Sequence, residues 1–264
     1  IVIDSKRIYK ISMLTPTLNY RVASAACLLF LIVFAMDKTI AEPVPFRATY
    51  KADYKGLPVS ATGIRELTKL SDNRFLLSST AESFFASIVE QSVFQLDEND
   101  NAMPLEYQYH RTGIGKNRHD VLAFDWANMK VENQVPEKSW NMGIDLGVFD
   151  KLLYQYQMRA DLKQAQNKDQ PWPALTYQVA DKRKLKRYDF EILQEEMVKT
   201  GIGHLQTLKI TRKRPAGDSR ITTFWLALEY DFMLVRFQQL KDDGSGFELL
   251  LSDAEFDGKK IEAD

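Results

Sequence analysis

Residues 46–54 read FRATYKADY, and this stretch decides the fold class. Its apolar residues alternate with polar or charged ones, which is typical of a strand with one buried and one solvated face. Similar runs follow along most of the chain, separated by short turns rich in Gly, Asp and Asn. These runs lie at 58–69, 74–82, 86–97, 105–109, 118–126, 129–134, 174–180, 184–193, 204–213, 219–229, 232–241 and 246–256.

One segment changes period and predicts an amphipathic helix over residues 148–163. Its apolar residues at helical spacing are Phe149, Leu152, Leu153, Tyr156 and Ala160. Because most connections between the strands are short, neighbouring strands should pair antiparallel. We therefore predict a mainly β fold, a large curved antiparallel sheet that forms a half-barrel or barrel with one amphipathic α-helix. Its outline should be like that of the periplasmic lipoprotein carriers, an analogy at the level of the fold.

The N-terminal region resembles a secretory signal. Residues 22–36 are apolar and uncharged, Arg21 precedes them, and a small residue, Ala41, follows at a suitable cleavage position. The apolar run is shorter than the roughly 20 residues of a bilayer span. We predict a signal peptide at 1–41, cleaved near Ala41, and a single β-rich domain at 42–264 in the periplasm.

Two alternatives to cleavage stay open: an uncleaved anchor, or lipidation of Cys27 inside the apolar run. Lipidation is disfavoured because a lipoprotein signal places its cysteine after the apolar stretch, and Leu28 to Phe34 follow this one.

Composition narrows the function classes. The 264 residues are 45% hydrophobic and 27% charged, which indicates a globular protein. Lys and Arg number 35 against 36 Asp and Glu, so the basic surplus of a general nucleic-acid binder is absent. Residues 1–41 hold five basic and two acidic residues, so the exported domain would have 30 basic and 34 acidic residues and no cysteine. We expect membrane contact only through the signal segment.

Several predicted strands are apolar on both faces, for example 84–89, 223–228 and 249–251. Both faces of such a strand must be shielded from water, one by the core and the other by a second apolar surface. The helix could provide one cover, and an apolar ligand such as a lipid, bound in the concave face, could provide the other. The candidate ligand-binding residues are Phe84, Phe85, Trp126, Phe149, Leu153, Tyr156 and Trp225.

No catalytic motif is present, and we expect no enzyme, no cofactor and no resident metal ion. His110 and His119 should face each other across a hairpin if residues 114–115 form a two-residue turn, but a metal site would need a third ligand. A basic cluster follows Asp181. It is either a solvated strand edge or a contact for an anionic lipid headgroup or lipopolysaccharide phosphate. Its members are Lys182, Arg183, Lys184, Lys186 and Arg187.

Several segments together resemble the bacterial domain-of-unknown-function family 3108. They are DKLL at 150–153, QMRADL at 157–162, TFWLA at 223–227, LVR at 234–236 with Gln238, FDW at 124–126 and the stretch 107–113. The resemblance covers roughly residues 45–255, with Met233 where such proteins often have proline. It implies an exported, β-rich periplasmic protein and supplies no catalytic residues.

These observations support three hypotheses. The first is a non-catalytic cell-envelope protein that binds a lipid or another apolar ligand in the concave face of the sheet. The second is a structural or interaction module of the envelope that binds another envelope protein through an exposed sheet edge or an aromatic patch. The third is an envelope hydrolase, which would need a cleft with converging acids and shifted pKa values.

Overall fold

The computed structural model describes residues 42–55, 60–71, 73–113, 116–214 and 217–262. These belong to one compact unit, Glu42–Asp264. The predicted signal segment at 1–41 and the turn at 114–115 lie outside the described residues. Within the described part of the chain, no helix is long and apolar enough to cross a membrane.

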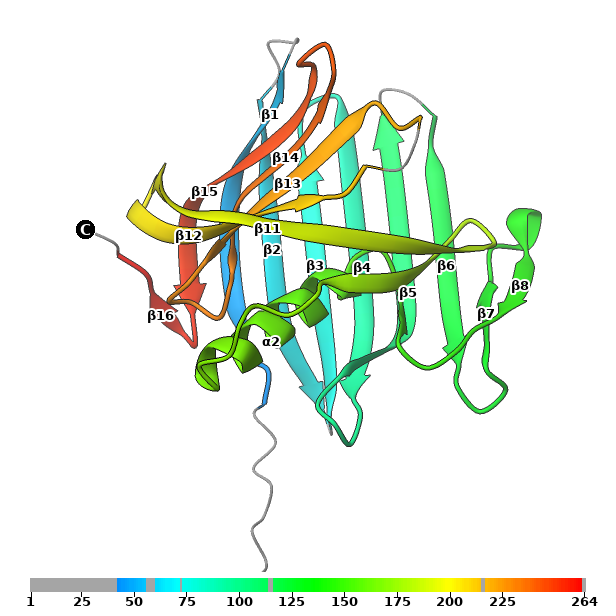
Figure 1. The fold of residues 1–264 in the computed structure, drawn as a ribbon. Helices are drawn as coiled ribbons and strands as arrows, with labels where there is room; N and C mark the ends of the chain where they lie inside the picture. Colours follow the sequence, from blue (N-terminus) through cyan, green and yellow to red (C-terminus); the bar gives the residue numbers. More distant parts are fainter. Residues whose placement is uncertain (1–41, 56–59, 72, 114–115, 215–216, 263–264) are drawn as a thin grey trace, which may run out of the picture. The chain divides into compact units, whose positions relative to one another are not determined.

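The described chain forms one sheet of sixteen strands, shown in Figure 1. The strands pair antiparallel except where β9 runs parallel to β10. The first eight follow one another in the sheet as they do in the sequence. They are β1 (Phe46–Lys55), β2 (Ser60–Ser71), β3 (Arg74–Glu82), β4 (Ala86–Leu96), β5 (Ala102–Gly113), β6 (Arg118–Asp125), β7 (Lys130–Asn133) and β8 (Trp140–Gly143), with the short 3-10 helix η1 (Pro136–Lys138) before β8.

The second half of the sheet joins the first where β15 pairs with β1. From there the order runs back from β15 to β9, so that β8 and β9 form the two ends of the sheet. The elements of this half are β9 (Val148–Phe149), α2 (Leu153–Asn167), β10 (Thr176–Asp181), β11 (Lys184–Thr200), β12 (Gly203–Arg212), β13 (Arg220–Ala227), β14 (Leu234–Lys241), β15 (Gly246–Phe256) and β16 (Lys259–Lys260).

Strand β1 shows why the alternating pattern folds as a sheet. Phe46, Ala48 and Tyr50 are buried on one face, whereas Arg47 and Lys51 are exposed on the other. The buried Tyr50 hydroxyl donates a hydrogen bond to the Leu234 carbonyl, 2.7 Å away, and so satisfies its polar group inside the core. The predicted fold class, a large curved antiparallel sheet with one α-helix, is confirmed for the described residues.

The helix differs from its predicted bounds, 148–163. Residues 148–149 form β9, and α2 covers Leu153–Asn167, so it starts and ends later than predicted. The reason is local: Asp150 Oδ1 accepts hydrogen bonds from the backbone N–H groups of Leu152 and Leu153, both at 2.8 Å. A carboxylate that takes these free N–H groups fixes the start of a helix.

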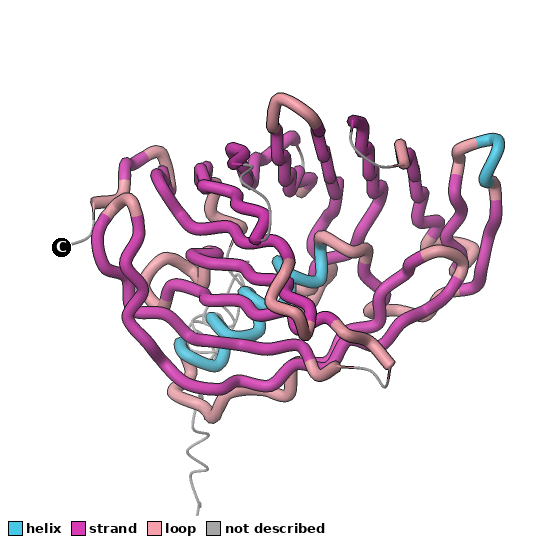
Figure 2. Tube along the Cα trace, turned by 90° about the horizontal axis from the view of Figure 1, so that it is seen from above, coloured by secondary structure: helices cyan, strands magenta, loops and turns pink. Residues whose placement is uncertain are grey.

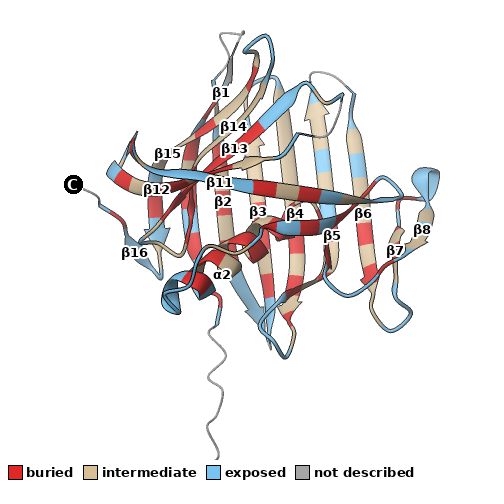
Figure 3. Cartoon of the chain, viewed as in Figure 1, coloured by how far each residue is buried: buried red, intermediate tan, exposed pale blue. Residues whose placement is uncertain are grey.

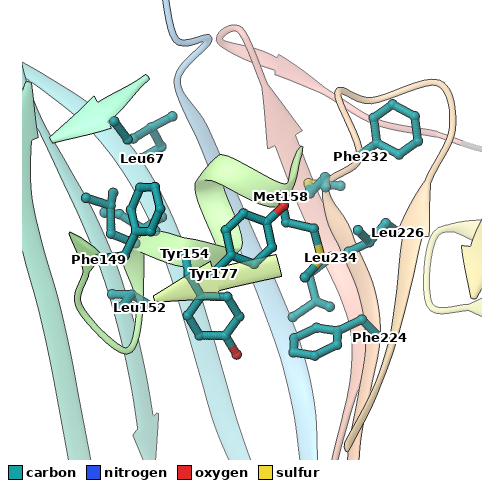
Figure 4. Packing of buried hydrophobic residues seen from close by; sticks show 14 of the residues in the cluster. Leu67, Phe149, Leu152, Tyr154, Met158, Tyr177, Phe224, Leu226, Phe232 and Leu234 are labelled. Atoms are coloured by element: carbon teal, nitrogen blue, oxygen red, sulfur yellow. The ribbon is translucent and has the colours of Figure 1, made fainter. Parts of the chain in front are cut away.

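Helix α2 lies between the two halves of the curled sheet, as the view from above in Figure 2 shows. On one side, Tyr156 packs against Phe94 of β4, with ring centroids 4.9 Å apart. On the other side, Tyr154 stacks on Phe190 of β11 at 5.7 Å. Figure 4 shows Tyr154 among the apolar side chains of both halves. The helix therefore fills much of the concave face that we had considered for an apolar ligand.

Polar contacts also hold the helix. Arg159 Nε donates to the Asp231 carbonyl at 2.9 Å, and Lys163 Nζ lies 2.6 Å from the Asp231 carboxylate. Arg65 of β2 donates to the side-chain oxygen of Gln155 at 3.0 Å. These contacts tie α2 to β2 and to the turn between β13 and β14, which are far apart in the sequence, and indicate that the helix is an integral part of the core.

The strand 223–228, apolar on both faces, is covered without any ligand. Phe224 packs inside, against Phe190 and Phe237. On the opposite face, Trp225 is covered by the cationic groups of Lys209 and Arg236, which lie 5.1 Å and 4.8 Å from the ring centroid. The stems of Lys and Arg side chains can bury an aromatic ring while the charge stays near water.

Candidate functional site in a basic cavity

A cavity lies in the part of the concave face that α2 leaves open. Buried residues concentrate around α2, whereas the upper parts of β5 and β6 carry partly buried and exposed residues (Figure 3). The cavity is bordered by the strands from β4 to β8 on one side and by the strands from β10 to β14 on the other. It has two lobes that share Arg118, Lys151, Asp181 and Lys182.

The first lobe, called the basic lobe below, has a volume of about 440 Å³. Among the described residues that line it, seven are basic and three are acidic, an excess of four positive charges. This contrasts with the chain as a whole, whose net charge is −1. The basic residues are Arg118, Lys151, Lys182, Lys186, Arg212, Arg214 and Arg220, and the acidic ones are Glu90, Asp181 and Asp218.

The second lobe, called the mixed lobe, has a volume of about 490 Å³. Tyr107, Leu122 and Trp140 supply aromatic and apolar surface, while Asn133 and Lys138 supply polar groups. Because the two lobes share residues, one ligand could place a charged group in the first and an apolar part in the second.

Lys151 is the central cation of the site. It directly precedes the first turn of α2, and its ammonium lies 4.6 Å and 5.4 Å from the ring centroids of Tyr109 and Tyr107. Burial lowers the pKa of Lys151, opposed by the charge of Glu90. A partly dehydrated cation over two aromatic rings is well placed to meet an anion from the cavity.

Asp181 links both sides of the cavity. Its Oδ2 lies 2.5 Å from Lys186 Nζ, and its Oδ1 lies 3.8 Å from the guanidinium of Arg118. Burial opposes ionisation of this carboxyl, but the hydrogen bond from Lys186 and the charges of Lys151, Lys186 and Lys182 hold its pKa below the ordinary value. Oδ1 is buried without a hydrogen-bond partner among the described residues. Asp181 thus fixes cations from β6 and β11 around one space.

Beneath the cavity, Asp150 is fully buried. Besides its two backbone hydrogen bonds, its Oδ2 lies 2.6 Å from Ser92 Oγ. Burial raises the pKa of Asp150 to about 7, against the hydrogen bonds that favour the charged form. Nearby, the Tyr107 hydroxyl donates to Glu90, and burial together with the Glu90 charge raises the pKa of Tyr107 well above its usual value.

The structure disperses the seven residues predicted to bind a ligand. Phe149 and Leu153 are in the core, and Tyr156 packs against it. Trp225 is covered as described above, and Trp126 stacks on Phe124 and donates to the Pro104 carbonyl. Phe84 and Phe85 are exposed at the β3–β4 connection. None of the seven is among the described residues that line the two lobes.

The predicted pairing of His110 and His119 is confirmed. They are direct partners in the β5–β6 ladder, with ring centroids 5.3 Å apart. Both are exposed and stand on the face opposite Tyr109 and Arg118. Among the described residues, no group of three or more His, Cys, Asp or Glu is placed to hold a metal ion.

Sequence reasoning missed Arg118 and Lys151 as site residues. The signal that pointed to the site was the basic cluster after Asp181, for which we had considered an anionic headgroup. Lys182 and Lys186 of that cluster do line the basic lobe. Arg118 and Lys151 do not belong to any basic cluster in the sequence. They become neighbours only in the folded protein, where β10 and β11 cross over β5 and β6.

The fold and the cavity define a class of protein: a curled antiparallel sheet that holds a helix and, beside it, a cavity that is open to solvent and lined by charged residues. The chain belongs to the family described as protein of unknown function (DUF3108), whose model matches residues 49–252. The resemblance seen in the sequence is thereby confirmed. The comparison with curated proteins gives no match.

Among solved structures, the chain is similar to the MucA/MucB complex of Pseudomonas aeruginosa, with 13% identity and a TM-score of 0.30. The match covers 83% of this chain and 54% of that one, so the chain spans about half the length of that protein. A candidate lipoprotein from Parabacteroides distasonis is similar at 10% identity, with a TM-score of 0.30 and 81% and 96% of the two chains covered. A candidate exported protein with a YmcC-like fold from Bacteroides fragilis is similar at 11% identity, with a TM-score of 0.28 and 80% and 94% covered.

Proposed function

We propose that this is a non-catalytic protein of the cell envelope, exported to the periplasm, that binds an anionic amphiphile in the cavity of its concave face. One observation carries the proposal: in a chain of almost zero net charge, the basic lobe has an excess of four positive charges. Cations gathered in a partly dehydrated space attract an anion more strongly than the same charges on an open surface.

The two lobes suggest how such a ligand would lie. A phosphate or carboxylate would meet Lys151 and Arg118 in the basic lobe, where each cation can donate a charge-assisted hydrogen bond. The apolar part would lie against Leu122 and Trp140 in the mixed lobe. This modifies the original hypothesis of a lipid in an apolar groove, because α2 fills the apolar part of the concave face.

The acids near the cavity have structural roles that support a non-catalytic function. Asp150 accepts hydrogen bonds from Ser92 and from the backbone at the start of α2, and Glu90 accepts a hydrogen bond from the Tyr107 hydroxyl. Asp181 holds Arg118 and Lys186 in place. Export is supported by the positive, apolar and small-residue pattern of residues 1–41.

The proposal predicts that Lys151→Met weakens the binding of an anionic amphiphile by roughly tenfold or more, since one charge-assisted contact is lost. Decyl phosphate is a suitable probe and decyl maltoside its uncharged counterpart, with binding measured by calorimetry. The wild type should prefer decyl phosphate, and the variant should lose that preference. Thermal unfolding of both proteins checks that the variant is folded.

Lys199→Met is the matched control, because Lys199 is an exposed lysine at the far end of β11. It should bind decyl phosphate like the wild type. Equal binding of both probes by the wild type, or unchanged binding by Lys151→Met, would refute the proposal. Native mass spectrometry of the protein purified from the periplasm, followed by lipid extraction, would then identify any ligand that it carries.

A further inference from the structure

The connection between β3 and β4 exposes two aromatic rings. Phe84 is 95% exposed and Phe85 is 54% exposed, and their ring centroids are 5.1 Å apart in an edge-to-face arrangement. Single exposed apolar residues are common on protein surfaces, but two adjacent phenylalanines at the tip of a hairpin form a compact apolar point.

This tip is held in place by hydrogen bonds. Ser83 Oγ accepts hydrogen bonds from the backbone N–H groups of Phe85 and Ala86, at 3.3 Å and 3.1 Å. The Ser83 N–H donates to the Ala86 carbonyl at 2.9 Å. The Phe85 backbone lies so close to Gly113 of β5 that a Cβ there would meet the Phe85 oxygen at 2.1 Å. The rings are thus presented on a fixed turn.

Basic residues flank the tip. Ala86 pairs with Gly113, so the β3–β4 tip is next to the end of the β5–β6 hairpin. That end carries Arg111 and Arg118. The guanidinium of Arg111 donates to the Lys116 carbonyl, and Arg118 lines the basic lobe. Figure 1 shows that β3 and β5 end, and β4 and β6 begin, at the same upper end of the sheet.

The mouth of the basic lobe lies at this same end. Arg214 and Arg220, at the two sides of the β12–β13 connection, line the lobe together with Arg118. Glu90, inside the lobe, is five residues along β4 from Phe85, or about 17 Å at the rise of a β-strand. The acids near the tip and the mouth are fewer: the exposed Glu82, Asp242 and Asp243, and the half-buried Asp218, with Asp218 and Asp242 in ion pairs.

We propose that Phe84 and Phe85 insert into the surface of a bilayer that contains anionic lipids, with the basic mouth of the cavity facing the headgroups. Aromatic side chains flanked by Lys and Arg are suited to the boundary between headgroups and acyl chains. The apolar area also favours a membrane over a protein partner. Two phenylalanines bury at most a few hundred Å², whereas a stable protein interface buries about 1,200–2,000 Å².

This inference goes beyond our expectation that only the signal segment would touch a membrane. It also differs from the proposed function, because insertion of the tip does not require that the cavity be occupied. If both are true, the mouth would open toward the lipids that could supply an anionic amphiphile.

The test is co-sedimentation of the protein with vesicles of phosphatidylcholine alone or mixed with phosphatidylglycerol. The protein is isolated from cells, after any cleavage of the signal segment. The wild type should bind the mixed vesicles better, and salt should weaken that binding. The double variant Phe84→Ser/Phe85→Ser should bind the mixed vesicles with an affinity lower by roughly tenfold or more, because two apolar anchors are lost. Leu146→Ser, at a leucine that is 74% exposed in the connection before β9, should bind like the wild type.

A Phe84→Trp variant gives a second readout. It keeps an interfacial aromatic at the tip, so it should bind the vesicles and show a blue shift of tryptophan fluorescence that the wild type lacks. Absence of binding to either vesicle, equal binding by the double variant, or an equal loss in Leu146→Ser would overturn the proposal. If neither kind of vesicle is bound, the next experiment would be a search for a protein that binds the two phenylalanines.

The two proposals fail separately. The double variant should still bind decyl phosphate, and Lys151→Met should still bind vesicles through the tip. Loss of both activities in the double variant, with unchanged thermal unfolding, would show that the tip belongs to the ligand site and would refute a separate membrane anchor.

Discussion

Replacing Asp150 with asparagine should remove a loss of stability that the wild-type protein undergoes as the pH rises from about 4 to about 7. Asp150 is 0% exposed, and its two oxygens meet Ser92 Oγ and the N–H groups of Leu152 and Leu153. Burial raises its pKa from 3.8 to about 7, and the charge of Glu90 adds to the rise. The folded protein therefore holds this proton more tightly than the unfolded chain does.

The sign of the effect follows from linkage. Below the unfolded pKa the group is protonated in both states, and the stabilisation is complete. As the pH rises to the folded pKa, the unfolded chain releases the proton first, so the free energy of unfolding falls. A difference of about three pKa units corresponds to a fall on the order of 4 kcal/mol over this window.

Asparagine reproduces the protonated form without titrating. Its side-chain oxygen can accept from the N–H groups of Leu152 and Leu153, and its amide can donate to Ser92 Oγ. Urea unfolding of the wild type and Asp150→Asn across this pH range checks the prediction. The difference between the two proteins should change with pH in favour of the variant, and other titrating groups cancel in that difference.

Asp150→Ala provides the control for the helix start. It also lacks the titration, but it leaves two N–H groups without their acceptor, so it should be about 1–2 kcal/mol less stable than Asp150→Asn at every pH. Parallel stability curves for wild type and Asp150→Asn would contradict the prediction, because they would mean that Asp150 keeps its ordinary pKa when buried.

Features that depend on local pattern could be predicted from the sequence. The alternation in 46–54 placed Phe46 and Tyr50 on the buried face, and a turn at 114–115 was enough to pair His110 with His119. In a hairpin, a short connection fixes the register, and the register fixes which side chains share a face. The antiparallel class of the sheet followed from the same short connections.

The helix boundary shows where local pattern becomes ambiguous. Phe149 fits a helical spacing with Leu152 and Leu153, but it belongs to β9, which pairs with β10 about thirty residues later. That pairing is not visible in a window of residues around 149. Asp150 before an apolar periodic segment was the available signal, since Asp is a common residue at the start of a helix.

A bulge had a similar effect in β11. The predicted strand 184–193 continues to Thr200, because the register shift between Ile192 and Gln194 interrupts the alternation without ending the strand. Glu196, which lies beyond the shift, accepts a hydrogen bond from Trp225 of β13. Sequence alone could not distinguish this bulge from a turn.

The cavity could not be predicted, because it depends on how one half of the curved sheet lies over the other half. Arg118 and Asp181 are far apart in the sequence, and their 3.8 Å contact exists only where β10 meets the face of β6. Lys151 falls between the apolar positions Phe149 and Leu152 of the sequence, and this position alone does not show which way the lysine points. Whether a charged residue points to solvent or to an internal cavity is decided by the other half of the sheet.

Leu162→Ala should lower the free energy of unfolding by about 2–5 kcal/mol, the usual range for a leucine removed from a close-packed core. Leu162 is 0% exposed and belongs to the same buried cluster as Met158 and Phe224. Denaturant unfolding at neutral pH measures the loss. Leu146→Ala is the matched control, since its 74% exposed side chain should change stability by less than about 0.5 kcal/mol.

The same experiment decides whether α2 is part of the core or a lid over the concave face. If it is part of the core, as its contacts with β4, β11 and the Asp231 turn indicate, far-ultraviolet circular dichroism and tryptophan fluorescence should report one transition, shifted together in Leu162→Ala. A lid would detach alone, so the variant would lose helical signal first and keep the wild-type midpoint for the sheet. That second outcome would make the space under α2 available to an apolar ligand after all, and it would move the binding site from the basic lobe to the face that the helix now fills.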